Sequence, residues 1–185
     1  GYGSHSAVLW FAVTPENTLV VYRELYVSKV LAVDLARMVL ELEQHDGKMS
    51  YGVLDSSCWH KRGDTGPSLA EQMILAGCRW RPSDRSRGTR VSGKNELHRL
   101  LQVDPDTGEP GITFFSSCVN TVAQIPVLPL DKKNPEDIDT HAEDHIYDAL
   151  RYGISSRPIP RNIFDLEKPT DKAHKFQPAD QVFGY

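Results

Sequence analysis

The residues best suited to chemistry lie in one stretch, residues 137–152, which reads Asp-Ile-Asp-Thr-His-Ala-Glu-Asp-His-Ile-Tyr-Asp-Ala-Leu-Arg-Tyr. On a single helix, its polar and apolar side chains would fall on opposite faces. The polar face would carry His141, Asp144, His145 and Asp148. Carboxylate oxygens and imidazole nitrogens together suit a divalent cation. A solvated acidic helix without a ligand is the alternative, and spacing alone slightly favours it.

A separate acidic residue, Asp55, follows the apolar run Tyr51–Leu54, which we expect to be a short buried strand. Ligands gather at the carboxyl ends of strands in open α/β sheets, so a functional role is favoured over a turn-capping one. Carboxylates that converge repel one another unless a cation such as Mg²⁺ or Mn²⁺ neutralises them. Two such ions could activate water for phosphodiester hydrolysis, with His145 as a metal ligand or proton carrier.

Positive charge is concentrated elsewhere, although the net charge is −4. A basic strip beside an acidic pocket suits an enzyme that grips a polyanion and attacks it with metal, whereas two solvated faces are the alternative. We expect the basic loop 83–91, together with Lys94, to touch DNA phosphates, with a mobile charged loop as a nearly equal alternative. The candidates are Arg85, Arg87, Arg90 and Lys94, together with Lys61 and Arg62 next to Asp55.

Three other chemistries find little support. The string Gly88–Asn95 nearly matches a phosphate-binding loop, but Asn95 replaces the Ser or Thr that should hold Mg²⁺, so we reject an ATP site. His141 and His145 lack a third His or Cys for zinc. The three cysteines form no CxxC pair and have no marked base nearby, which argues against a thiol nucleophile.

The remaining pattern predicts the elements that position these residues. Apolar runs joined by a short turn indicate a hairpin, and helical and strand-like segments then alternate, which is typical of a mixed sheet flanked by helices in an α/β fold. We expect one domain over residues 1–155 and a proline-rich, extended or disordered tail over 156–185. The expected elements are strands 6–14, 18–26, 51–54, 79–82 and 111–116 and helices 32–45, 68–76, 92–102, 119–128 and 140–152.

Composition narrows the setting. The 185 residues have the apolar and charged content of a soluble globular protein, with no run long enough to span a membrane and no signal peptide. An odd number of cysteines indicates a reducing, cytosolic compartment. The chain starts at Gly1 without methionine, so we expect it to be a piece of a longer polypeptide.

Several of these segments resemble one known family. Residues 136–153 are similar to the C-terminal signature of large terminase subunits from tailed bacteriophages and prophages. The likeness extends over about residues 1–156 and leaves the tail uncovered. The other matching segments are Gly1–Trp10, Leu19–Tyr26, Tyr51–Ser57, Val91–Leu97 and Phe114–Cys118.

The resemblance implies an RNase H-like nuclease domain of a DNA-packaging motor, which cuts concatemeric double-stranded DNA with two Mg²⁺ or Mn²⁺ ions. It makes Asp55 the second catalytic acid, Asp148 the third and His145 the metal-site histidine, with Asp144 as a weaker metal candidate. The first acid, which the family carries on its first strand, would lie a residue or two before Gly1. An ATPase domain would precede this chain, the portal and the small terminase subunit would be partners, and the host cytoplasm would be the location.

Two rival functions stay open. The piece could be a non-catalytic module that docks on DNA or on the portal, in which case the acidic face is only a solvated surface. It could also be an RNase H-like resolvase or transposase domain, which would prefer branched DNA.

Overall fold

The computed structural model describes residues 3–61, 66–86, 88–132, 134–135, 137–139 and 143–157. Near its start, β1 (His5–Val13) and β2 (Leu19–Ser28) pair antiparallel. Asn17 in the turn between them has a φ of 69°, a left-handed conformation that asparagine tolerates better than most residues. The hairpin predicted from two apolar runs is confirmed.

The described strands form two hydrogen-bonded sheets. β5 (Ile112–Phe114) runs parallel to β2, which gives a mixed three-stranded sheet in the order β1-β2-β5. β3 (Gly52–Leu54) and β4 (Trp80–Pro82) pair parallel as a separate two-stranded sheet. Among the described residues, β1 and β3 therefore each have a strand partner on one side only.

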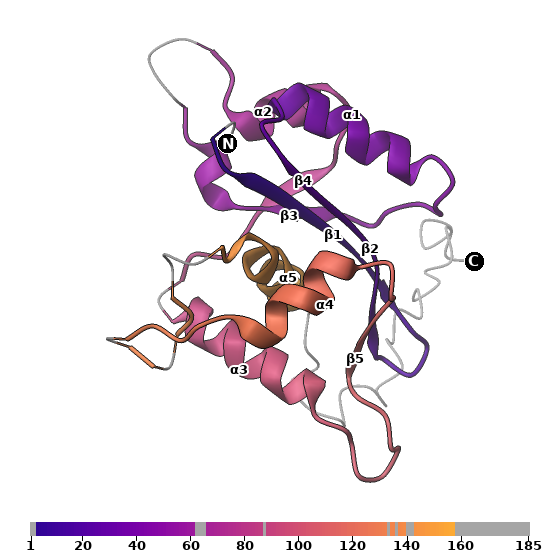
Figure 1. The fold of residues 1–185 in the computed structure, drawn as a ribbon. Coiled ribbons are helices and arrows are strands. Elements are labelled where there is room, and N and C mark those ends of the chain that lie inside the picture. The colour runs from indigo at the N-terminus through magenta and orange to yellow at the C-terminus, as the bar shows by residue number, and fades with distance from the viewer. Residues whose placement is uncertain are drawn as a thin grey trace, which may run out of the picture.

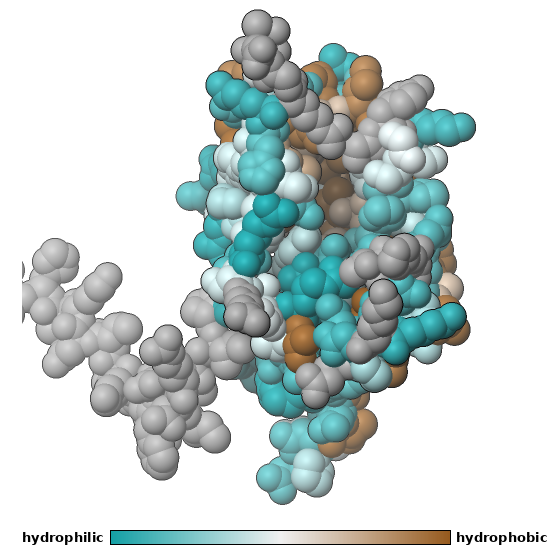
Figure 2. Space-filling view, turned by 90° about the vertical axis from the view of Figure 1, so that its left-hand side faces the viewer, coloured by the Kyte–Doolittle hydropathy of each residue, from teal (hydrophilic) through white to brown (hydrophobic). Residues whose placement is uncertain are grey.

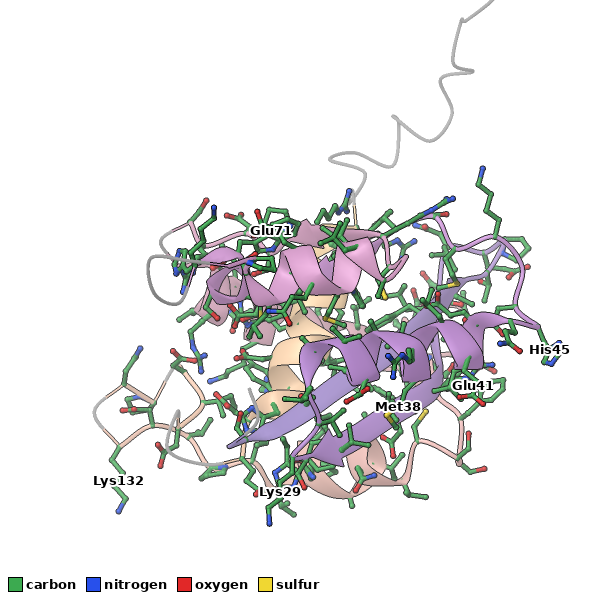
Figure 3. The ribbon with its side chains drawn as sticks, turned by 90° about the horizontal axis from the view of Figure 1, so that it is seen from above. Lys29, Met38, Glu41, His45, Glu71 and Lys132 are labelled. Carbon is green, nitrogen blue, oxygen red and sulfur yellow. The ribbon has the colours of Figure 1, made fainter. Side chains whose placement is uncertain are left out.

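Helices cover both faces of these strands (Figure 1). α1 (Ala32–Glu43) and α2 (Leu69–Leu75) pack against each other over one face, and Figure 3 shows them from above, with Met38 and Glu41 labelled on α1. Their core with the strands consists of Trp10, Leu35, Ala36, Val39, Met73 and Cys78.

The opposite face carries α3 (Thr89–Leu101), α4 (Val119–Gln124) and α5 (His145–Ser156). A second buried cluster fills the space beneath them and includes Val21, Leu97, Ile112, Leu150 and Ile154. Strands covered by helices on both faces form the predicted α/β architecture, and this prediction is confirmed.

The two sheets belong to one layer. Along β1, Trp10 points into the α1–α2 core, whereas Leu9 and Phe11 pack on the opposite cluster, as the alternation of side chains on a strand requires. Leu54 of β3 and Trp80 of β4 also pack on the α1–α2 core. On the other face, α5 contacts both β1 and β3. The same helices thus enclose both sheets.

Helix starts follow local capping, and the sequence predicted some of them correctly. Ser68 accepts a hydrogen bond from the Glu71 N–H while the Glu71 carboxylate accepts one from the Ser68 N–H, so a capping box starts α2 at Ser68, where the sequence predicted the helix to begin. The predicted start of the next helix at Ser92 is wrong. The N-cap of α3 is Gly88, whose φ of 88° suits glycine, and the Ser92 N–H already bonds to the Gly88 carbonyl.

The last described helix also differs from the prediction. α5 starts at His145 instead of residue 140, with Asp144 at its N-cap, and it continues to Ser156. His141 is outside the described residues, as are residues 158–185, so the predicted tail stays a prediction. No helix in the described part of the chain is long and apolar enough to cross a membrane.

Candidate functional site

Asp55 lies where β3 ends, as predicted, and its carboxylate is held from two sides. It is the N-cap of a short 3₁₀ helix, Ser56–Trp59, and its Oδ1 accepts the Ser57 N–H at 2.6 Å. Its Oδ2 accepts the hydroxyl of Tyr152 at 2.8 Å. Burial raises the pKa of Asp55, but the hydrogen bonds from Ser57 and Tyr152 outweigh it and hold the pKa below its ordinary value. The half-buried carboxylate therefore stays ionised at neutral pH.

The bond from Tyr152 connects Asp55 to α5. Tyr152 is four residues after Asp148, so the two side chains lie on the same face of the helix, one turn apart. Asp55 therefore contacts the predicted acidic helix, through the turn of α5 that follows Asp148. Tyr152 itself was not singled out from the sequence, where it looked like an ordinary aromatic residue.

Two arginines contact Asp148. Arg151, only 5% exposed, donates to Asp148 Oδ1 from Nε at 3.2 Å and from Nη2 at 2.8 Å. Arg90 of α3 approaches the same oxygen, with its Nη1 at 3.5 Å. Asp148 is therefore charge-compensated within the protein.

Arg90 also contacts two further carboxylates. Its Nε is 3.1 Å from Asp137 Oδ2, and its Nη2 is 3.6 Å from Asp144 Oδ2. Burial and the charge of Asp148 raise the pKa of Asp144, although Arg90 acts in the opposite direction. The acidic residues predicted to share a face do gather, and a guanidinium group lies among them.

His145, the first residue of α5, lies beside the beginning of β1. Its ring centroid is 6.3 Å from that of His5, which stacks on Tyr26 at 4.7 Å. The Nδ1 of His5 is also 3.5 Å from Glu143 Oε1. Sequence reasoning assigned no role to His5, Tyr26 or Glu143, because nothing local relates the start of a strand to a helix far along the chain.

The residues predicted to contact DNA divide into two groups. Lys61 and Arg85 are exposed, and the charge of Arg85 helps to lower the pKa of Asp55, which indicates that Arg85 is near this carboxylate. Arg62 and Arg87 lie outside the described residues. Arg90 and Lys94 are engaged within the protein.

Lys94 has a different setting from the surface one that the sequence predicted. It is 7% exposed, and its Nζ donates to the Pro135 carbonyl at 3.1 Å. Lys94 lies in α3, as the predicted helix 92–102 implied, but on the buried side of that helix. Gly93 likewise lies inside α3 and not in a phosphate-binding loop.

The described residues offer the donor atoms that a divalent metal prefers, but their side chains are not grouped as a complete set of ligands. Carboxylate oxygens are the ligands that Mg²⁺ and Mn²⁺ prefer. Within the described ranges, however, no three His, Cys, Asp or Glu side chains are grouped closely enough to hold an ion. The thiols are poor nucleophiles where they are buried, because burial raises the pKa of Cys78 and of Cys118.

The enclosed layer of mixed strands and the acids at its edge define an RNase H-like α/β fold. The chain is similar in structure to the nuclease domain of the phage P22 large terminase, with a TM-score of 0.62 over 91% of this chain and 82% of that one. The two sequences are 20% identical, so the likeness concerns the fold. No family model matches the sequence, and no curated protein matches it by sequence. The terminase-like fold expected from the sequence motifs is confirmed.

Proposed function

We propose that this chain is the metal-dependent endonuclease domain of a viral DNA-packaging terminase and that it cuts concatemeric double-stranded DNA. One observation carries the proposal: Asp55, at the carboxyl end of β3, is hydrogen-bonded to Tyr152, one turn from Asp148. Acids at these positions, on a fold similar to that of a terminase nuclease domain, are in the right region for joint metal binding.

In this proposal, Asp55 and Asp148 hold the metal, with His145 and Asp144 next to them. Two bound Mg²⁺ or Mn²⁺ ions would lower the pKa of a coordinated water and neutralise the leaving oxygen. Tyr152 orients Asp55 through its hydroxyl. Lys61, Arg62, Arg85 and Arg87 bind the phosphate backbone; Arg90 and Lys94 are omitted because both are held within the protein.

The first acid belongs to a strand ahead of Gly1 in this proposal. Support comes from the open edges of β1 and β3, because both strands lie in the layer between the same helices. A strand pairing with both would lie next to β3, which carries Asp55 at its carboxyl end. Figure 2 shows a hollow lined by hydrophobic atoms on the side of the molecule where the N-terminal label lies in Figure 1.

The partners follow from the same proposal. The substrate is double-stranded DNA, and an ATPase domain on the same polypeptide supplies the translocation. The portal and the small terminase subunit bind the assembled motor, in the cytoplasm of a host that carries the phage or prophage.

Nicking of supercoiled plasmid in Mn²⁺ tests the proposal, with a version of the chain extended upstream through the first acid. We expect Asp148→Asn and Asp55→Asn each to lower the rate by about 100-fold or more, since each removes charge from the metal site. Asp34→Asn is the matched control, because Asp34 pairs with the exposed Arg37 on α1. Undiminished cutting by Asp148→Asn would remove α5 from the mechanism.

A second candidate is a non-catalytic docking module. It is favoured by the observation that arginines already neutralise Asp148 and Asp144. Calorimetry with Mn²⁺ separates the two, because a docking module predicts no heat that depends on Asp148. Preferential cutting of branched DNA would instead favour a resolvase.

A further inference from the structure

Arg90 lies at the centre of three carboxylates. Its guanidinium group reaches Asp137 with Nε at 3.1 Å, Asp148 with Nη1 at 3.5 Å and Asp144 with Nη2 at 3.6 Å. The Asp137 contact has hydrogen-bond geometry, whereas the other two are ion pairs at longer range. One cation is thus shared among acids from two segments.

The packing of α3 on α5 keeps Arg90 in this place. Gly93 allows the close approach, since a Cβ there would come within 2.5 Å of Arg151 Cγ. The Tyr147 hydroxyl donates to the Arg90 carbonyl at 3.4 Å. Arg90 is the second residue of α3, so any shift of the first turn of this helix would move the guanidinium relative to α5.

The guanidinium group is an incomplete partner for these acids. Its Nη2 is buried and has no hydrogen-bond partner within the part of the chain that the structure describes. Buried polar groups normally have hydrogen-bond partners. Arg90 therefore neutralises the charge of these acids without forming all the hydrogen bonds that its guanidinium group could make. Asp144 and Asp148 are four residues apart on adjoining turns and repel each other, which gives them a need for a cation of some kind.

We propose that Arg90 is an internal counter-cation that competes with the divalent ion for Asp144 and Asp148. Metal binding would then require the guanidinium group to release these two carboxylates, while its bond to Asp137 can persist. This inference rests on the proposed nuclease function and adds a control on its metal site. It gives Arg90 a role opposite to that of a DNA-contacting arginine.

The role as competitor predicts that removing the arginine strengthens metal binding. A residue that only positioned the acids would weaken metal binding when removed, and a residue that only contacted DNA would leave it unchanged. Charges at such short range interact strongly in a partly buried site, so we expect Arg90→Gln to tighten Mn²⁺ binding by about tenfold or more.

Isothermal titration calorimetry with Mn²⁺ measures this directly, on the upstream-extended version of the chain that carries the proposed first acid. The variants are Arg90→Gln, Arg90→Lys and the control Arg99→Gln, which neutralises an exposed arginine on the same helix that pairs with Glu96. We expect Arg99→Gln to match the wild type and Arg90→Lys to bind Mn²⁺ more tightly by a smaller factor, because an ammonium group cannot span three carboxylates. Without metal, Arg90→Gln should melt at a lower temperature than the wild type and gain more on adding Mn²⁺.

The outcomes separate this inference from the proposed function. If the wild type binds Mn²⁺ in a manner that Asp148→Asn abolishes, but Arg90→Gln binds no more tightly, the competition is refuted and the nuclease proposal stands. If neither the wild type nor any Arg90 variant binds Mn²⁺, both fail together. Should Arg90→Gln not fold, Arg90→Lys decides, and an affinity equal to or below that of the wild type overturns the inference.

Discussion

Replacing Tyr152 by phenylalanine tests the contact that connects Asp55 to α5. The substitution removes only the hydroxyl, which donates to Asp55 Oδ2 at 2.8 Å, and keeps the ring. Burial and the charge of Asp148 raise the pKa of Tyr152, so the hydroxyl remains a protonated donor throughout the physiological range. The lost interaction is thus a hydrogen bond to an ionised acceptor.

A hydrogen bond to a charged group contributes about 1.5–3 kcal/mol, and the lower end applies here because Asp55 is half-buried and keeps the Ser57 N–H. We therefore expect Tyr152→Phe to lower the free energy of unfolding by about 1–2 kcal/mol at pH 7. For a chain of this size, that corresponds to a fall in Tm of about 3–6 °C.

The effect should depend on pH in a defined direction. The pKa of Asp55 is lowered by folding, so its contribution to stability is present above the unfolded pKa of about 4 and is lost as the pH falls through the folded pKa. The difference between wild type and Tyr152→Phe should thus be largest at pH 7 and shrink on acidification below about pH 4.

Urea denaturation followed by circular dichroism at pH 7 and pH 3 measures this difference. Tyr51→Phe is the matched control, because the exposed Tyr51 hydroxyl donates to a neutral carbonyl, that of Ser156, at 3.3 Å. The control should lose less than about 0.5 kcal/mol at either pH. Equal stability of Tyr152→Phe and wild type at pH 7, or a gap that persists unchanged at pH 3, would refute the reasoning.

Two further predictions concern the packing around the site. Glu24→Gln should cost about 1–3 kcal/mol at pH 7, because the Glu24 carboxylate accepts four hydrogen bonds from Asn120 and Thr121 at the start of α4. These bonds lower the pKa of Glu24, although burial acts to raise it. In denaturation at pH 3, the stability difference between wild type and Glu24→Gln should therefore be smaller than at pH 7. An unchanged difference would contradict the role given to these hydrogen bonds. Gly153→Ala should lower Tm, since a Cβ there meets the Phe11 ring, at a cost of about 1–2 kcal/mol after its better helix propensity. Gly47→Ala is its control, because the added Cβ has no atom within 4 Å. Equal Tm values for both variants would show that Phe11 and β1 move aside without a cost in stability.

Local sequence patterns predicted the strands and helices, because these elements depend mainly on residues that are close together in the chain. The alternating and apolar runs around residues 6–26 describe a hairpin whose partner strand is next in the chain. Asp55 was found because a carboxylate directly after a buried strand is unusual. Ser68 after Pro67 was readable as a helix start, since the residue that caps a helix is adjacent to it in the chain.

Long-range contacts were not readable in the same way. Charge counts located basic and acidic stretches, but nothing in them showed that Arg90 would face Asp137 and Asp148 instead of solvent. For Arg90 the error arose at Gly88, whose left-handed conformation starts α3 early and places Arg90 on the helix beside the acids of α5. A glycine beside a basic loop gives no sign of its φ angle.

The one-sided pairing of β1 and β3 affects how the protein should behave in concentrated solution. Each of these strands has a row of main-chain donors and acceptors that no other described strand pairs with, and such rows act as templates for an extended peptide. Neither β1 nor β3 contains a lysine or proline, the residues that normally protect such rows, whereas β4 ends at Pro82. We therefore expect concentration-dependent self-association of this chain, and a synthetic peptide that completes the layer should suppress it and raise Tm.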